Sequence, residues 1–205
     1  MKGAGFAAWV LKCRKGREEF PGLPIVGAVK WPKAWGTGEM KVISGGQTGV
    51  DRAALDAAQA LGIPCGGFCP RGRRAEDGRI PERYPLVELA SSAYAARTRA
   101  NVEAADATLV LVQGEPAGGT RLTIQWCQRL NKPHLVLSPL EVQALQKARD
   151  WFAAVRPDVL NVAGPRESQW PGGYQVAFDF LVRLFQSLRD SCPEPKRETR
   201  EDEGP

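Results

Sequence analysis

VISGGQTGVDRAALDAAQALGI, residues 42–63, changes its hydrophobic pattern partway along and so decides the fold. Residues 40–43 form a short, partly β-branched run that is typical of a buried strand, whereas apolar residues recur at helical spacing from Arg52 onward. The polar, glycine-rich loop between them therefore joins a strand to a helix. A strand that leads directly into a helix is the building unit of α/β folds.

The loop between this strand and helix contains three glycines, Gly45, Gly46 and Gly49, which permit positive φ angles and close approach by another backbone. Asp51 precedes the alanine-rich run and is a candidate helix N-cap. The first turn of a helix presents unpaired N–H groups and the positive end of the dipole, so we expect a phosphate site. The glycine spacing matches neither G-x-G-x-x-G nor the P-loop, and a strand-to-helix turn without a ligand is the alternative.

The chain has 205 residues, of which 43% are hydrophobic and 25% charged, and its formal net charge is +5. This composition suits a globular protein with one core. The positive charge is spread thinly and no basic run is interleaved with aromatics, so nucleic acid is not an expected partner. No apolar run approaches the roughly 20 residues of a membrane span, and no signal peptide is recognisable. We therefore expect a cytoplasmic protein that does not bind membranes.

The chain has five cysteines and a single histidine. An odd number of cysteines without a C-x-x-C motif indicates neither a zinc cluster nor a disulfide framework. Cys65 and Cys69 fall four apart in a predicted strand and so share a face, where they could meet a metal. Small buried cysteines are the other interpretation. We expect reduced thiols and no metal ligands.

The two ends of the chain differ from its middle. Residues 1–39 carry glycine and proline without a sustained hydrophobic period, and Met40 stands at the start of the first convincing strand. We expect residues 1–39 to be a disordered extension or a mis-annotated start, residues 40–189 to form the domain, and residues 190–205 to form a disordered charged tail.

Strand and helix patterns alternate through the rest of the domain. Further strands are predicted at 63–70, 107–112, 134–138 and 159–164, and further helices near 98–105, up to 129, and at 141–155 and 174–188. Parallel strands need crossover helices, so we expect an α/β, Rossmann-like three-layer sandwich with a mostly parallel central sheet. Ligands bind such sheets beyond the carboxyl ends of the strands, at the switch point.

Polar residues follow several of these strands and should converge on one rim. Arg71 follows the second strand, residues 118–120 follow the third and open a helix, and residues 166–168 follow the last. Each group also has a simpler interpretation. Arg73 and Arg74 suit a solvated connection, the glycines at 118–120 suit a helix N-cap, and the charges at 166–168 suit a local ion pair.

Five segments in one order resemble the molybdenum carrier family, the molybdenum cofactor carrier proteins. They belong to a Rossmann-like group that includes the cytokinin-activating phosphoribohydrolases, often labelled lysine decarboxylases. The segments, spread over about residues 40–188, are MKVISGGQTGVDRAALDAA, GGFCPRGRRAEDGRIPERYPL, YAARTRANVEAADATLVL, GGT and LNVAGPRESQWPG. The resemblance implies a homo-oligomer, a dimer or tetramer, that binds the phosphorylated molybdenum cofactor (molybdopterin). It implies storage or delivery to a molybdoenzyme recipient, without catalysis.

Carried over position by position, the resemblance assigns cofactor binding to Gly45, Gly46, Gln47, Thr48, Gly49, Asp51, Arg71, Arg97, Thr98, Asn101, Gly118, Gly119, Thr120, Arg166, Glu167 and Ser168. We expect the glycine backbones to cradle a phosphate and the arginines at 71 and 97 to neutralise it. Gln47, Asn101 and Glu167 would hydrogen-bond the pterin edges or a sugar. No catalytic residue is assigned.

Two other functions would use the same phosphate loops. Phosphoribohydrolases resemble G-G-x-G-T-x-x-E, whose glutamate acts on an N-glycosidic bond, whereas here Thr123 stands three residues after Thr120 and no acid follows before Glu141. A hydroxyl does not replace a carboxylate as acid or base near neutral pH, which disfavours hydrolysis of a nucleoside monophosphate. Other carboxylates keep that function open, namely Glu76, Asp77, Glu103 and Glu167. A nucleotide-binding sensor, with ADP-ribose or an NAD-like ligand, is the remaining alternative.

Overall fold

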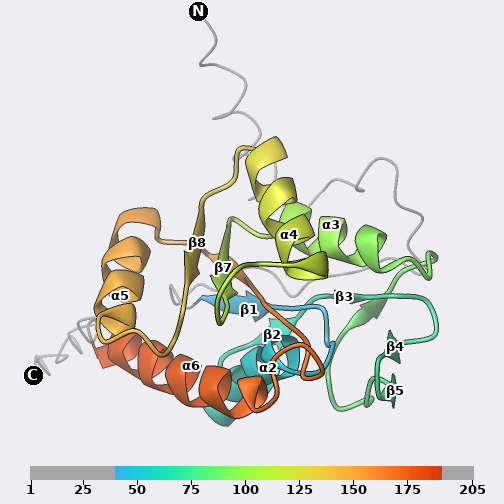
Figure 1. Ribbon diagram of the computed structural model, residues 1–205, viewed down its shortest axis with the longest axis horizontal. Coiled ribbons are helices and arrows are strands. Elements are labelled where there is room, and N and C mark those ends of the chain that lie inside the picture. Colours follow the sequence, from blue (N-terminus) through green and yellow to red (C-terminus); the bar gives the residue numbers. More distant parts are fainter. Residues whose placement is uncertain (1–39, 191–205) are drawn as a thin grey trace, which may run out of the picture.

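A five-stranded sheet runs through the protein in the strand order β2-β1-β9-β7-β8 (Figure 1). The structure is a computed structural model that describes residues 40–190. The strands are β1 (Lys41–Ile43), β2 (Cys65–Gly66), β7 (Ala107–Leu111), β8 (His134–Leu137) and β9 (Val159–Ala163). Every pair of neighbours in this sheet is parallel, which the alternating pattern predicts because helices make the crossovers.

Helices cover both faces of the sheet. Those described are α2 (Val50–Ala60), α3 (Tyr94–Ala104), α4 (Gly118–Arg129), α5 (Ala144–Val155) and α6 (Gly173–Asp190). Figure 1 shows α2, α5 and α6 on one face and α3 and α4 on the other. The predicted Rossmann-like three-layer sandwich is confirmed.

The main core lies between the sheet and the α2–α6 pair. Four alanines of α2 are fully buried, and their small side chains let the helix approach both the sheet and α6 closely. α6 contributes Leu181, Leu184 and Phe185 to the same core. All five residues of β7 are buried because the strand is central and covered on both faces, which fits its continuous apolar run, ATLVL.

One predicted strand, 63–70, is wrong as a single element because the chain turns out of the sheet at Gly67. β2 ends before this glycine, and β3 (Phe68–Cys69) pairs instead with β6 (Val87–Glu88) in a separate two-stranded sheet. The φ of Gly67 is +127°, and a Cβ there would lie 2.1 Å from the Ser44 carbonyl oxygen. Only glycine fits this bend, and an apolar run does not reveal it.

The polar connection after β3 contains a hairpin that the sequence did not reveal, with strands β4 (Arg74–Ala75) and β5 (Gly78–Arg79). The side chain of Arg73, just before it, is buried. Its guanidinium donates to the carbonyls of Ile80 (3.1 Å), Pro81 (2.9 Å), Tyr84 (2.9 Å) and Leu86 (3.2 Å). The interpretation of Arg73 as a solvated side chain is therefore wrong, whereas Arg74 is exposed.

The predictions for the chain ends stay predictions, because residues 1–39 and 191–205 lie outside the described residues. At the other boundary, α6 extends one residue beyond the predicted domain end and includes Asp190. Within residues 40–190, no helix combines the length and the apolar character needed to cross a membrane.

Replacing Arg73 by Ala is expected to lower the free energy of unfolding by about 2 to 4 kcal/mol, because several buried carbonyls lose their donor. Urea denaturation followed by circular dichroism measures the change. Arg74→Ala is the matched control, since that exposed neighbour should change stability by no more than about 0.5 kcal/mol. Equal effects of the two substitutions would contradict this role of Arg73.

Candidate anion-binding site

The loops that follow the parallel strands meet at one edge of the sheet. β9 leads to α6 on one face, while its neighbour β7 leads to α4 on the other, so the chain leaves the sheet in opposite directions (Figure 1). This divergence makes the crevice in which α/β proteins bind ligands. The loops also touch, since a Cβ on Gly49 would lie 2.6 Å from the Pro165 carbonyl oxygen.

The first loop, residues 44–49, offers unpaired backbone donors at the head of α2. Gly46 and Gly49 both have φ of +72°. Among the described residues, no hydrogen-bond partner is found for the backbone N–H of Gly45, Gly46 or Gly49. Buried or nearly buried N–H groups without partners favour an acceptor from a ligand or from water.

Asp51 lies in the first turn of α2, whose N-cap is Gly49, so the prediction of Asp51 as the helix N-cap is wrong. Its side chain forms an ion pair with Arg97 beside this loop. Arg97 Nη1 lies 2.8 Å from Asp51 Oδ2, and the two side chains are 14% and 5% exposed. The same oxygen accepts the backbone N–H of Gln47 at 3.3 Å. Burial raises the pKa of Asp51, and the Arg97 guanidinium opposes this shift. The pair holds Arg97 across Gly45, where a Cβ would lie only 1.8 Å from Nη1.

Glu76, at the tip of the β4–β5 hairpin, connects the first loop to the last one. It accepts hydrogen bonds from the Thr48 hydroxyl and from the backbone N–H of Ser168, the latter at 3.1 Å. Its backbone N–H donates to Gln47 Oε1 at 2.9 Å. Although burial opposes ionisation, the bonds from Ser168 and Thr48 and the Arg166 charge hold the pKa of Glu76 below its ordinary value. Glu76 is therefore an anion at neutral pH.

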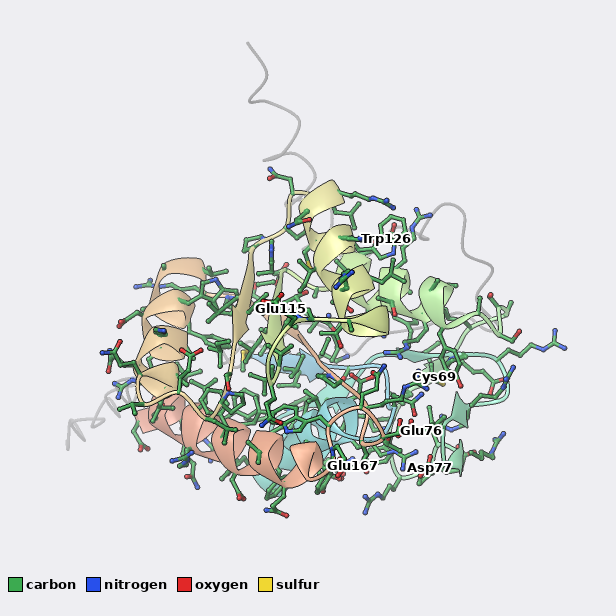
Figure 2. The ribbon with its side chains drawn as sticks, viewed as in Figure 1. Cys69, Glu76, Asp77, Glu115, Trp126 and Glu167 are labelled. Atoms are coloured by element: carbon green, nitrogen blue, oxygen red, sulfur yellow. The ribbon has the colours of Figure 1, made fainter. Side chains whose placement is uncertain are left out.

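Glu167 caps α6 with its side chain. Its two carboxylate oxygens accept the backbone N–H groups of Gly172 at 2.6 Å and Tyr174 at 3.0 Å. Its own backbone N–H donates to the Thr48 hydroxyl at 3.2 Å. Figure 2 shows Glu76, Asp77 and Glu167 gathered beside the hairpin and the start of α6. These contacts bind the predicted last-loop residues to the first loop.

Gly118 and Gly119 are exposed at the N-terminus of α4, as the sequence predicts. No side chain caps this helix, and among the described residues their two N–H groups have no partner. Thr120 is buried, and its N–H donates to the Ala117 carbonyl. A Cβ on Gly118 would lie 3.5 Å from Gln169 Nε2, so this turn faces the last loop across the crevice.

Two predicted residues of α3, Thr98 and Asn101, are buried. Asn101 bonds the backbone of Phe68 twice: its Oδ1 accepts the N–H at 2.9 Å and its Nδ2 donates to the carbonyl at 3.0 Å. Nδ2 also donates to the Arg97 carbonyl at 3.2 Å. Asn101 therefore anchors β3 to α3, with its polar atoms engaged within the protein.

Arg71 is exposed two residues after β3, which belongs to the separate two-stranded sheet and not, as the sequence predicted, to the central one. Its backbone N–H donates to the Ser91 carbonyl at 2.9 Å, which fixes the start of its loop. Within residues 40–190 its guanidinium makes no hydrogen bond or ion pair. An exposed guanidinium without a partner is available to a ligand.

The sequence did not reveal a second polar cluster on the outer side of the first loop. An open cleft of about 390 Å³ is lined by Thr48, Gly49, Arg52, Asp56, Pro81, Arg83, Tyr84, Glu167 and Tyr174. Asp56 Oδ2 accepts the hydroxyls of Tyr84 at 2.9 Å and Tyr174 at 2.8 Å. These residues are far apart in the sequence, and no local pattern links them.

Comparison with known proteins decides the family. A family model described as "Circularly permutated YpsA SLOG family" matches residues 42–185. The chain belongs to the circularly permutated YpsA SLOG family. The solved structure of a "Putative molybdenum carrier protein" from Syntrophus aciditrophicus SB is 41% identical with a TM-score of 0.67, over 72% of this chain and 95% of that one. No curated protein matches. The resemblance seen in the sequence is confirmed.

Metal-binding side chains do not gather in this member of the YpsA SLOG family. In the part of the chain described, no group of three His, Cys, Asp or Glu residues is placed to hold a metal ion. Cys65, Cys69 and Cys127 are free thiols, and burial raises the pKa of each. Cys65 and Cys69 stand on strands of different sheets, because the chain bends between them.

Asn101→Ala is expected to lower the free energy of unfolding by about 1 to 3 kcal/mol, because two backbone groups of Phe68 lose their partners. Urea denaturation measures this loss. The exposed helix position Gln128→Ala serves as the control and should have little effect. A stable Asn101→Ala protein that has lost anion binding would show that Asn101 acts on the ligand instead.

Proposed function

We propose that this protein binds the molybdenum cofactor through its phosphate and carries it without catalysis. The observation that carries the proposal is the set of backbone N–H groups without a partner among the described residues, at Gly45 and Gly46 after β1 and at Gly118 and Gly119 at the start of α4. The printed name of the 41% identical relative supports molybdenum carriage. Such donor sets are typical of phosphate sites.

The arginines supply the charge that a phosphate needs. Arg71 has an exposed, unpartnered guanidinium, and Arg97 lies across Gly45 with an Nε that is buried and has no hydrogen-bond partner. We propose that Arg71 binds the phosphate directly and that Arg97, fixed by Asp51, raises the positive potential at the glycine loop. The N-terminal dipoles of α2 and α4 add to this potential.

The remaining predicted residues divide into ligand contacts and supports. Gln47 uses Oε1 to accept two backbone N–H groups, from Thr48 and Glu76, which leaves Nε2 to donate to a ring or sugar oxygen. Thr98 and Thr120 lie under the site and shape it. Molybdenum that arrives with its pterin keeps the ligands that the cofactor supplies, which fits the absence of a metal-binding cluster in residues 40–190.

The phosphoribohydrolase alternative needs a carboxylate that follows the glycine turn of α4. Thr123 occupies that place, and its hydroxyl donates to the Gly119 carbonyl at 3.0 Å. Glu76 and Glu167 are held by several hydrogen bonds, and Glu76 is ionised, so neither is a ready proton donor. A carrier is therefore the better proposal. We further propose a cytoplasmic homo-oligomer that delivers its ligand to a molybdoenzyme.

A thermal-shift series on the full chain tests the proposal. Molybdenum cofactor is expected to stabilise the protein, by about 2.7 kcal/mol at one hundred times its Kd, because a ligand of the native state alone raises its stability. Molybdate, AMP, ADP, NAD and ADP-ribose are compared, and the AMP sample is assayed for free adenine. Selective stabilisation by a nucleotide would indicate a sensor, and free adenine would indicate an N-glycosidase.

Arg71→Ala is expected to weaken binding of inorganic phosphate by about tenfold, with almost no change in Tm of the free protein, since its guanidinium makes no internal contact. Isothermal titration calorimetry measures the affinity. Arg74→Ala removes an equally exposed positive charge three residues along and should leave binding almost unchanged. An unaltered affinity in Arg71→Ala would remove Arg71 from the site.

A further inference from the structure

The carboxylate of Glu76 is the shared partner of four donor groups from Thr48, Arg166 and Ser168. The Glu76 carboxylate accepts the Thr48 hydroxyl, the Ser168 backbone N–H at 3.1 Å and the Ser168 hydroxyl at 2.5 Å. Arg166 Nε lies 3.6 Å from the same carboxylate. Two hydroxyls, a backbone N–H and a guanidinium together form the donor set that proteins use for phosphate groups.

The Glu76 carboxylate therefore lies where an anionic ligand of these donors would bind. Thr48, Arg166 and Ser168 are residues that the family resemblance assigns to the ligand, yet here they are bound to a group of the protein's own chain. The Glu76 side chain is only 18% exposed, while Arg166 is 44% exposed and has a face open to solvent.

The hairpin that carries Glu76 is anchored at its base by the buried Arg73 guanidinium, whereas its tip, residues 76–77, is held by polar contacts at the surface. Its strands have two residues each, and the described contacts of its tip are those of Glu76, the bond of its N–H to Gln47, and the Arg52–Asp77 ion pair at 2.6 Å. Asp77 is 48% exposed, and space is open around Gly78. Displacement of the tip breaks these polar contacts and leaves the anchored base in place.

An approach to the donor set exists beside it. Thr48, Gly49 and Glu167 line the open cleft of about 390 Å³ on the outer side of the first loop. The Thr48 hydroxyl, which donates to Glu76 and accepts from the Glu167 N–H, thus lies between the cleft and the carboxylate.

We propose that Thr48, Ser168 and Arg166 form a second anion subsite that Glu76 occupies in the free protein, and that a second phosphate group, beyond the one held at the glycine loops, displaces Glu76 and opens the tip of the β4–β5 hairpin. The inference rests on the proposed function in one respect, since it needs a phosphorylated ligand. The inference goes beyond the proposed function because it assigns to Glu76, a residue of the chain itself, the role of competing with the ligand for the subsite. The bound state then differs from the free state by an exchange of one anion for another.

Glu76 lowers the apparent affinity of the subsite for phosphate, because only those molecules in which Glu76 has left the subsite can bind. If the hairpin is open for about a tenth of the time, the apparent Kd is about tenfold weaker than that of the open site. Ligands with a single weak anion are rejected by this competition, whereas a phosphate with two charges displaces a carboxylate with one.

Calorimetric titration of the full chain with inorganic phosphate tests the inference. With binding to the two sites fitted separately, the second phosphate is expected to bind Glu76→Ala about tenfold more tightly than it binds the wild type. Glu82→Ala controls for net charge, because this 70% exposed carboxylate pairs with Arg79 at 2.7 Å and with Arg73 at 3.5 Å and contacts none of the subsite donors, and should leave affinity unchanged. Adding Ser168→Ala to Glu76→Ala should abolish the gain, because a donor of the subsite is then lost.

Affinity equal in the wild type and Glu76→Ala, or a gain that survives Ser168→Ala, overturns the subsite and leaves the proposed phosphate site standing. Failure of phosphate to bind any of these proteins overturns both the subsite and the proposed phosphate site.

A second measurement uses the wild type alone, in case Glu76→Ala does not fold. Phosphate is expected to accelerate tryptic cleavage at the exposed Arg74 or Arg79, and cleavage that slows or stays constant contradicts displacement of the hairpin.

Discussion

The buried ion pair between Asp51 and Arg97 is the interaction on which the arrangement of the site depends. Asp51 begins a helix on one face of the sheet and Arg97 belongs to a helix on the other, so their contact at 2.8 Å ties the two outer layers together above the strand ends. A buried charge that loses its partner is costly, often by about 3 to 5 kcal/mol, so the pair constrains both helices at once. The first loop takes its shape between them.

Glycines allow the first loop to pack closely against Arg97 and against the last loop. At Gly45 the space for a side chain is filled by the Arg97 guanidinium, and at Gly49 it is filled by the backbone of the last loop. The same loop has backbone N–H groups without a partner among the described residues, at Gly45, Gly46 and Gly49. Gly45 and Gly49 therefore both permit the close packing and contribute N–H donors.

Much of the fold could be predicted because it depends on local pattern. The change from strand to helical period within residues 42–63 and the alternation after it gave the sheet and its helices to within a few residues, except at Gly67. Of the candidate site, the places of the glycine loops at the end of β1 and at the start of α4 could be predicted, whereas their binding of an anion, and that of Arg71, stays a prediction. The roles of Arg73 and Glu76 could not be predicted, since each depends on carbonyls or hydroxyls brought together only by the folded chain.

The ends of the described segment lie together, on the side of the sheet away from these loops. Arg189, near the end of α6, donates to the Leu61 carbonyl at 2.5 Å. Three residues further along, the Pro64 carbonyl accepts the N–H of Val42 in β1. A short peptide joining these ends would cross none of the loops at the opposite edge. The order in which the chain visits the elements can therefore be rearranged without disturbing the site, which is the property that a circularly permutated family requires.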